Sequence, residues 1–206
     1  MSGSSPIRPL DAQMLHAYEG RLRSQGVPVD RWTRPGLASE EMGETLAPLG
    51  LSLPIEGRVW WGWHDGAIRE GQDKIIGPWR SFLSLAEAVK VAQEFRSMAE
   101  ELVEPDTPPL DDPDFRWNPA WLPIKGPQLP FVIDCSVADG TLTPIRFIDW
   151  QNVDGFFKPR AESFGQMVSW WIEAIDCGAW RWDPERNQWD THDELLEWDL
   201  RTNPLV

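Results

Sequence analysis

The densest group of side chains that could do chemistry is the segment RVWWGWHDG, residues 58–66. It holds three tryptophans together with His64 and Asp65. Tryptophan rings can stack on sugars or bury a large apolar area, and a histidine beside an aspartate can contribute to a metal site. Taken alone, the segment is compatible with a carbohydrate site, half of a metal site or the end of a buried helix.

The rest of the sequence gives a metal or catalytic site little support. The other histidines are His16 and His192, and no group of His, Cys, Asp and Glu has the spacing of metal ligands. There is no G-x-S-x-G nucleophile motif and no glycine-rich phosphate loop. Acidic pairs are frequent, as expected by chance among 33 acidic residues, so a carboxylate dyad stays open but a solvated face is the default. We therefore expect no enzyme, no cofactor and no metal.

The residues on either side of this segment predict a short helix. Pro54 suits the first turn of a helix, and Gly66 suits the left-handed position just after one. We expect His64 and Asp65 to lie in the last turn of this helix. The side chains expected to seal the core from it are Val59, Trp60 and Trp63.

Apolar periodicity and capping residues predict three more helices in the first half of the chain and a fourth near its C-terminal end. The clearest one opens on Ser84-Leu-Ala-Glu87, a capping box in which the hydroxyl and the carboxylate satisfy two backbone N–H groups. The three helices are expected between residue 10 and Gly26, between Ser39 and Gly50, and from Ser84 to about residue 103. A last long helix is expected between Ser163 and Gly178.

Short apolar runs bounded by proline and glycine predict strands. They are KIIGPW (74–79), WLPI (121–124), PFVIDC (130–135) and LTPIRFIDW (142–150). ADGT (138–141) is typical of a tight hairpin turn, and the tail from residue 179 is expected to add a strand or hairpin. This order of elements predicts an α+β fold with a mostly antiparallel or mixed sheet packed by helices.

The length suits one hydrophobic core. We expect a flexible tail over residues 1–9, one domain over 10–180, and a tryptophan-rich acidic extension over 181–206 that packs on the domain. The sequence shows no apolar signal segment and no run of transmembrane length. Cys135 and Cys177 fit no zinc or redox motif and are expected to be buried thiols. We therefore expect a cytoplasmic protein.

The net charge of −14 indicates which classes of partner to expect. It repels nucleic acid and anionic membranes and attracts basic proteins, so we expect neither nucleic-acid nor membrane binding. Between Glu100 and Asp114 there are seven acidic residues and no basic one. The residues expected to contact a partner are Asp106, Asp111, Asp112 and Asp114 of this loop, and Trp180, Trp182 and Trp189, which alternate among charged residues near the C-terminus.

Three blocks of sequence, in this order, resemble the SUKH superfamily, the Syd and Knr-related group that includes fungal cell-wall assembly regulators. Together they cover about residues 39–180, although KGPQLP stands where the family usually has a glycine-rich acidic turn. The blocks are EEMGETLAPLGLSLPIEGRVWWGWHDG (40–66), FRWNPAWLPIKGPQLPFVIDCSVADGTLTPIRF (115–147) and RAESFGQMVSWWIEAIDCGAW (160–180).

The resemblance implies a single α+β domain with one mixed sheet, and an activity of binding rather than catalysis. Many bacterial members of the family look like immunity proteins that neutralise a cognate toxin, and a charge of −14 would suit a basic toxin. The first expectation is therefore a toxin-neutralising protein that acts by direct binding. The alternatives are a regulatory or scaffolding module with an endogenous partner and, with less support, a carbohydrate- or metal-binding protein.

Overall fold

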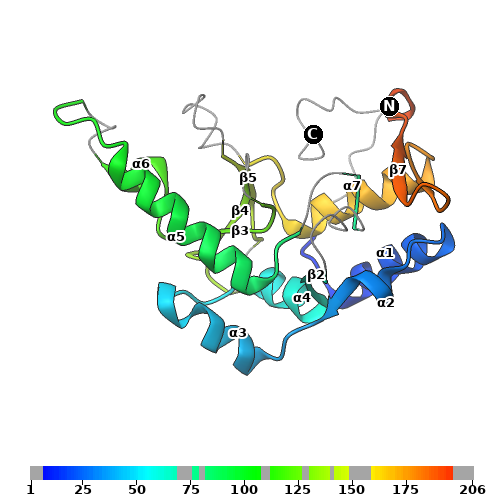
Figure 1. Ribbon diagram of the computed structural model, residues 1–206, viewed down its shortest axis with the longest axis horizontal. Helices are drawn as coiled ribbons and strands as arrows, with labels where there is room; N and C mark the ends of the chain where they lie inside the picture. The colour runs from blue at the N-terminus through cyan, green and yellow to red at the C-terminus, as the bar shows by residue number, and fades with distance from the viewer. Residues whose placement is uncertain are drawn as a thin grey trace.

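The computed structural model describes residues 7–68, 76–78, 82–107, 112–126, 130–139, 142–148 and 159–196. These residues combine helices with short antiparallel strands, as the prediction of an α+β fold requires (Figure 1). The α-helices are α1 (Ala12–Ser24), α2 (Val29–Trp32), α3 (Ser39–Leu46), α4 (Ile55–Trp63), α5 (Leu85–Glu101), α6 (Pro113–Arg116) and α7 (Phe164–Asp176). Two short 3-10 helices are η1 (Ala47–Leu49) and η3 (Asp193–Leu195).

The strands form three separate sheets within the described residues, so the prediction of a single mixed sheet is wrong. Each strand is only three or four residues long, and helices occupy the chain between the sheets, which keeps the strand pairs apart. Every pairing is antiparallel. The sheets are β1 (Thr33–Pro35) with β2 (His64–Ala67), β3 (Trp121–Pro123) with β4 (Phe131–Asp134) and β5 (Ile145–Phe147), and β6 (Trp180–Asp183) with β7 (Gln188–Thr191).

The strands predicted at 121–124, 130–135 and within 142–150 are confirmed as β3, β4 and β5, and the predicted C-terminal hairpin is β6–β7. The predicted strand at 74–79 is not seen in its described part, because residues 76–78 form a bend. The other residues of that run lie outside the described residues, as do the last two of the predicted ADGT turn.

The predicted helices are confirmed, because their signals are local. The Ser84 hydroxyl accepts the Glu87 N–H, and the Glu87 carboxylate accepts the Ser84 N–H at 2.8 Å, so the capping box opens α5 as expected. Ser163 caps α7 by accepting the Gln166 N–H at 2.8 Å. Gly178, at φ +79°, supplies the left-handed residue just after α7.

The segment that contains His64 departs from its prediction. α4 ends at Trp63, and His64 is already extended, with φ −147° and ψ 136°. His64 and Asp65 therefore belong to β2 rather than to the last turn of a helix. Gly66 does adopt a positive φ of +72°, but within the strand, where a Cβ would lie 2.5 Å from the Ser84 nitrogen. The close approach of the chain before α5 requires this glycine.

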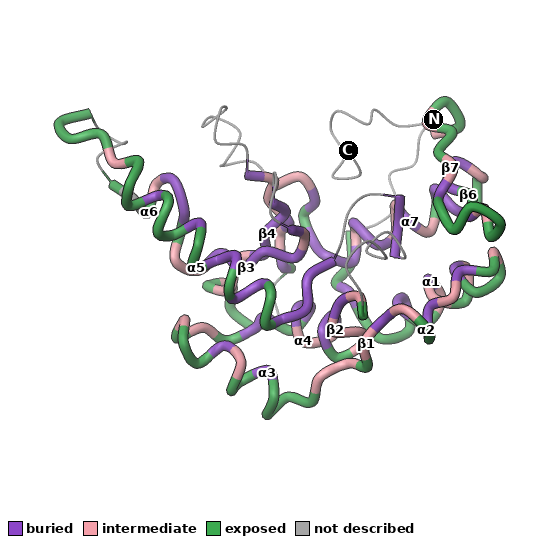
Figure 2. The backbone as a smooth tube through the Cα atoms, in the orientation of Figure 1, coloured by how far each residue is buried: buried purple, intermediate pink, exposed green. Residues whose placement is uncertain are grey.

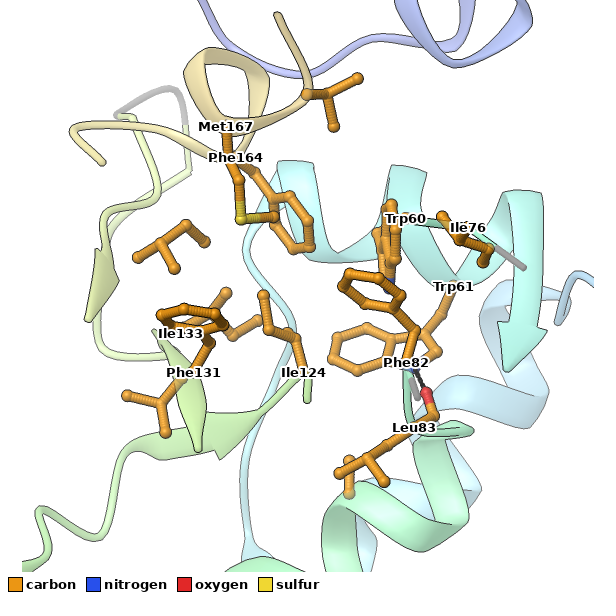
Figure 3. Packing of buried hydrophobic residues seen from close by; sticks show 14 of the residues in the cluster. Trp60, Trp61, Ile76, Phe82, Leu83, Ile124, Phe131, Ile133, Phe164 and Met167 are labelled. Carbon is orange, nitrogen blue, oxygen red and sulfur yellow. Dashed lines mark hydrogen bonds between the residues drawn. The ribbon is translucent and has the colours of Figure 1, made fainter. Parts of the chain in front are cut away.

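The hydrophobic core is built around α4. Trp60 is 1% exposed and Trp61 is fully buried, whereas Val59 and Trp63 only partly bury their side chains against the core. Figure 3 shows Trp60 packed near Phe82 and Phe164, whose ring centroids lie 5.0 and 4.9 Å from that of Trp60. The Trp61 indole N–H donates to the Leu83 carbonyl at 3.2 Å, so burial leaves its polar group satisfied.

The elements divide into two groups around α4 (Figure 1). On one side α5 packs against β3 and α3, and α6 packs against α5. On the other side α1 packs against α7, and β6 follows α7 with the hairpin. The far end of α5 and α6 thus lies at the opposite end of the molecule from β6 and β7.

Of the two cysteines, Cys177 is exposed, so the prediction that both are buried is wrong. It follows the last residue of α7, where the chain meets solvent. Cys135 is partly buried, and this burial, with the charge of Asp134, raises the pKa of its thiol to about 12. None of the described helices is long and apolar enough to cross a membrane.

Candidate functional site

The side chains of RVWWGWHDG are used for packing and for tying elements together. Because the indoles of Trp60 and Trp61 lie inside the core, they offer no platform on which a sugar could stack. Trp63 is half-buried, and its indole N–H donates to the Glu19 carboxylate on α1 at 2.6 Å. The structure therefore does not support a carbohydrate site at these three tryptophans.

His64 joins three elements. Its Nδ1 lies 3.1 Å from the Arg34 carbonyl on β1, and its Nε2 lies 3.7 Å from the Glu19 carboxylate on α1. Burial lowers the pKa of His64, although the Arg34 carbonyl and the Glu19 charge act in the opposite direction. The described residues contain no group of three or more His, Cys, Asp or Glu side chains that could hold a metal ion.

Glu19 is the acidic partner in this cluster. Burial raises its pKa, but hydrogen bonds from Trp63 and Arg23 and the nearby charges outweigh that effect, so its pKa is lower than usual. Asp65, the next residue after His64, accepts the Leu85 N–H at 2.7 Å at the start of α5. Glu19 and Asp65 thus have partners within the fold, as expected for residues that position elements, whereas the buried Nε2 of His64 forms no hydrogen bond within the described part of the chain.

Glu56 is a buried carboxylate that was not singled out from the sequence. It is 1% exposed, and its oxygens accept the backbone N–H groups of Leu10, Thr143 and Gly165 at 2.8, 2.7 and 2.9 Å. Burial raises the pKa of Glu56, and the backbone hydrogen bonds only partly offset this. The carboxylate ties α4 to the start of the chain, to the segment before β5 and to the first turn of α7. Glutamate in the first turn of a helix was the only sequence signal, and that signal is common.

The tryptophans expected on a partner surface are buried. Trp180, Trp182 and Trp189 are 1%, 7% and 8% exposed, so the prediction that they are exposed is wrong. Alternate residues of a strand face the same side, and Arg181 between the first two points to solvent instead. Trp182 pairs with Trp189 across the hairpin, and its ring also meets Trp32 edge-on with centroids 6.1 Å apart.

Gln25 holds this hairpin against the end of α1. Its side-chain amide donates to the Trp180 carbonyl at 3.2 Å and its side-chain oxygen accepts the Trp182 N–H at 2.7 Å. The described part of the predicted C-terminal extension therefore packs on the body, with its tryptophans facing inward.

The acidic residues predicted as contacts lie where a partner could reach them. Asp106, Asp112 and Asp114 are exposed, while Asp111 lies outside the described residues. Asp106, Asp112 and Asp114 belong to a region that we call the acidic arm. We define it as residues 94–107 and 112–116, which are the second half of α5, the start of the loop after it, and α6. Figure 2 shows this arm exposed over much of its length at one end of the molecule.

Aromatic stacking fixes the arm to the sheet. Phe95 on α5 stacks on Trp117 with ring centroids 4.8 Å apart and planes 13° from parallel, and Trp117 meets Trp121 of β3 edge-on at 5.9 Å. Arg116 of α6 donates to the Glu104 carboxylate at 2.8 Å. The exposed carboxylates are thus presented on a fixed support.

An open groove of about 490 Å³ lies between α1 and α7. Charged residues of both signs line it, and the Arg21 guanidinium crosses to Asp176 with two hydrogen bonds of 2.7 and 2.8 Å. Because side chains of both signs line the groove, it presents no cluster of a single charge.

A scan against protein-family models finds none that matches the chain, and a search of curated proteins finds no similar sequence.

Proposed function

We propose that the chain is a protein-binding module without catalytic activity, and that it acts in the cytoplasm as an immunity protein that neutralises a cognate basic toxin by direct binding. The observation that carries the proposal is the acidic arm, whose carboxylates are exposed and project from one end of the molecule (Figure 2). The ordered resemblance of residues 39–180 to the SUKH superfamily supports the same function.

The charges of the arm favour a basic partner. Glu101, Asp106, Asp112 and Asp114 are exposed, and within the described part of the chain none of them forms an ion pair. Unpaired surface carboxylates are available to a partner's lysines and arginines, and a net charge of −14 accelerates the encounter with a basic protein. A nuclease-type toxin, which must itself bind phosphate, has the required basic surface.

Co-expression tests this function. We expect the gene for the cognate toxin to lie immediately upstream of the gene for this chain. This upstream-encoded toxin should arrest growth alone, and growth should return when the chain is expressed with it. The purified pair should form a one-to-one complex by light scattering. An unrelated toxin serves as the control and should not be neutralised. If neither rescue nor a complex is observed, the proposed function is wrong, and an endogenous partner captured through the arm would favour the regulatory alternative.

A further inference from the structure

The second half of α5 exposes two large apolar side chains on one face. Met98 and Leu102 are 46% and 45% exposed, and they lie four residues apart, which places them next to each other on a helical surface. Single exposed apolar residues are ordinary. An adjacent pair at this spacing is the arrangement by which a helix inserts anchors into a groove of another protein.

The fold holds this pair in a fixed position. Phe95 and Ala99, on the neighbouring face of the same helix, are buried, and Phe95 stacks on Trp117 as described above. The helix therefore cannot rotate Met98 and Leu102 into the core without giving up that stack. A surface that is ordered before binding loses less conformational freedom when it binds.

Acidic side chains surround the pair. Glu94 and Glu101 lie four residues before and three residues after Met98, on the same side of α5. The last turn of α5 contains Glu100 and Glu101 and no basic residue. Glu100 pairs with Arg96 at 3.8 Å, but Glu101 forms no ion pair within the described residues. A carboxylate at the C-terminal end of a helix opposes its dipole, so Glu101 does not serve the stability of the helix.

We infer that Met98 and Leu102 are the apolar anchors by which this chain docks into an apolar groove with a basic rim on its protein partner. The inference rests on the proposed function and specifies how the partner is recognised. The anchors would fill the groove, while Glu94, Glu101 and Asp106 would face lysines or arginines along its rim.

The negative charge of this surface favours a basic protein partner over a second copy of the chain. Two copies that joined through this face would bring Glu94, Glu101 and Asp106 of each close to the same carboxylates of the other. Like charges placed opposite one another oppose association. A basic partner removes that repulsion, so the surface fits a different protein better than it fits itself.

The test compares substitutions of exposed apolar side chains inside and outside the arm. Met98→Ala with Leu102→Ala removes the anchors, and Leu195→Ala removes a leucine of equal exposure (44%) in η3, away from the arm. Isothermal titration would use two probes: the upstream-encoded toxin in a catalytically inactive form, and a synthetic amphipathic helix made only of leucine and lysine. The double variant should raise the Kd for both probes by about tenfold or more, whereas Leu195→Ala should leave both unchanged. All variants should keep the wild-type unfolding midpoint, since the replaced side chains are exposed.

The outcomes separate this inference from the proposed function. If the toxin binds and the double variant binds it as tightly as the wild type, the inference is overturned and the function stands. If the toxin does not bind but the double variant loses affinity for the leucine–lysine helix, the proposed function is overturned and the docking surface stands. If the double variant binds both probes as the wild type does, or if it changes the oligomeric state instead, the anchors do not serve a basic partner.

Discussion

Glu56 draws three distant parts of the chain to one carboxylate: Leu10, Thr143 and Gly165 all donate backbone N–H groups to it. Removing the carboxylate would leave these buried donors without a partner, and each such donor costs about 1–3 kcal/mol. We therefore predict that Glu56→Ala lowers the free energy of unfolding by about 3–5 kcal/mol, as measured by urea denaturation at neutral pH. Glu44→Ala, at an exposed position of α3, should change it by less than about 0.5 kcal/mol. Equal effects of the two substitutions would show that Glu56 does not hold the segments together.

His64 should make stability depend on pH. Because burial lowers its pKa below the ordinary value of 6.5, the folded protein binds fewer protons than the unfolded chain as the pH falls past that value. The stability that neutral His64 contributes is fully present above pH 6.5 and is lost as the pH falls through the lowered pKa. We predict that His64→Gln reduces the fall in unfolding free energy between about pH 7.5 and pH 5. An unchanged profile in His64→Gln would contradict this interpretation.

The sequence predicted the exposure of some individual residues correctly and that of others wrongly. The exposed positions of Asp106, Asp112 and Asp114 were expected because charged side chains in a proline-rich loop stay in water. Charged neighbours predict exposure for Trp180 and Trp182, and this is wrong, because alternation with Arg181 also indicates one buried strand face. Glu56 could not be assigned, since its donors lie up to 109 residues away along the chain.

Among the elements, the start of α7 depends on a close approach by the chain before α1. A Cβ on Gly165 would lie 2.4 Å from the Arg8 carbonyl oxygen and 2.6 Å from the Leu10 nitrogen, so any larger residue must push this segment away. A Cβ on Gly20, within α1, would meet no atom within 4 Å. We predict that Gly165→Ala destabilises the protein by about 1–3 kcal/mol, whereas Gly20→Ala stabilises it by about 0.5–1 kcal/mol. Thermal unfolding of both variants measures this contrast, and a stabilising Gly165→Ala would contradict the packing described.

The elements themselves were predicted to different degrees. The long helices α1, α5 and α7 follow from caps and apolar periodicity, which are encoded within a few residues of each element. The arrangement of the strands does not, because β1 pairs with β2 across α3 and α4, and no local pattern specifies that pairing. The end of α4 was placed too late because Gly66 suits a helix end, whereas the extended backbone at His64 is set by its pairing with Pro35.

On the scale of the whole molecule, the proposed binding surface lies at one end. The acidic arm lies far from the β6–β7 hairpin, with α4 between them (Figure 1). We predict that Asp106→Asn combined with Asp112→Asn and Asp114→Asn slows association with the upstream-encoded toxin by about tenfold at low salt, because steering by the arm is lost. Stopped-flow mixing measures this rate. Glu40→Gln combined with Glu44→Gln, on the exposed side of α3, should change it far less, and equal slowing by both sets would assign the effect to net charge alone.

If the chain binds a basic protein through its acidic surface, the affinity between the two proteins must depend on salt concentration. Isothermal titration of the chain with the upstream-encoded toxin should be repeated between about 0.05 and 0.5 M salt. We predict tight binding at low salt and an affinity that falls by about tenfold or more across this range, since salt screens exposed charges. An affinity that does not change with salt, or a toxin that is itself acidic, would contradict it.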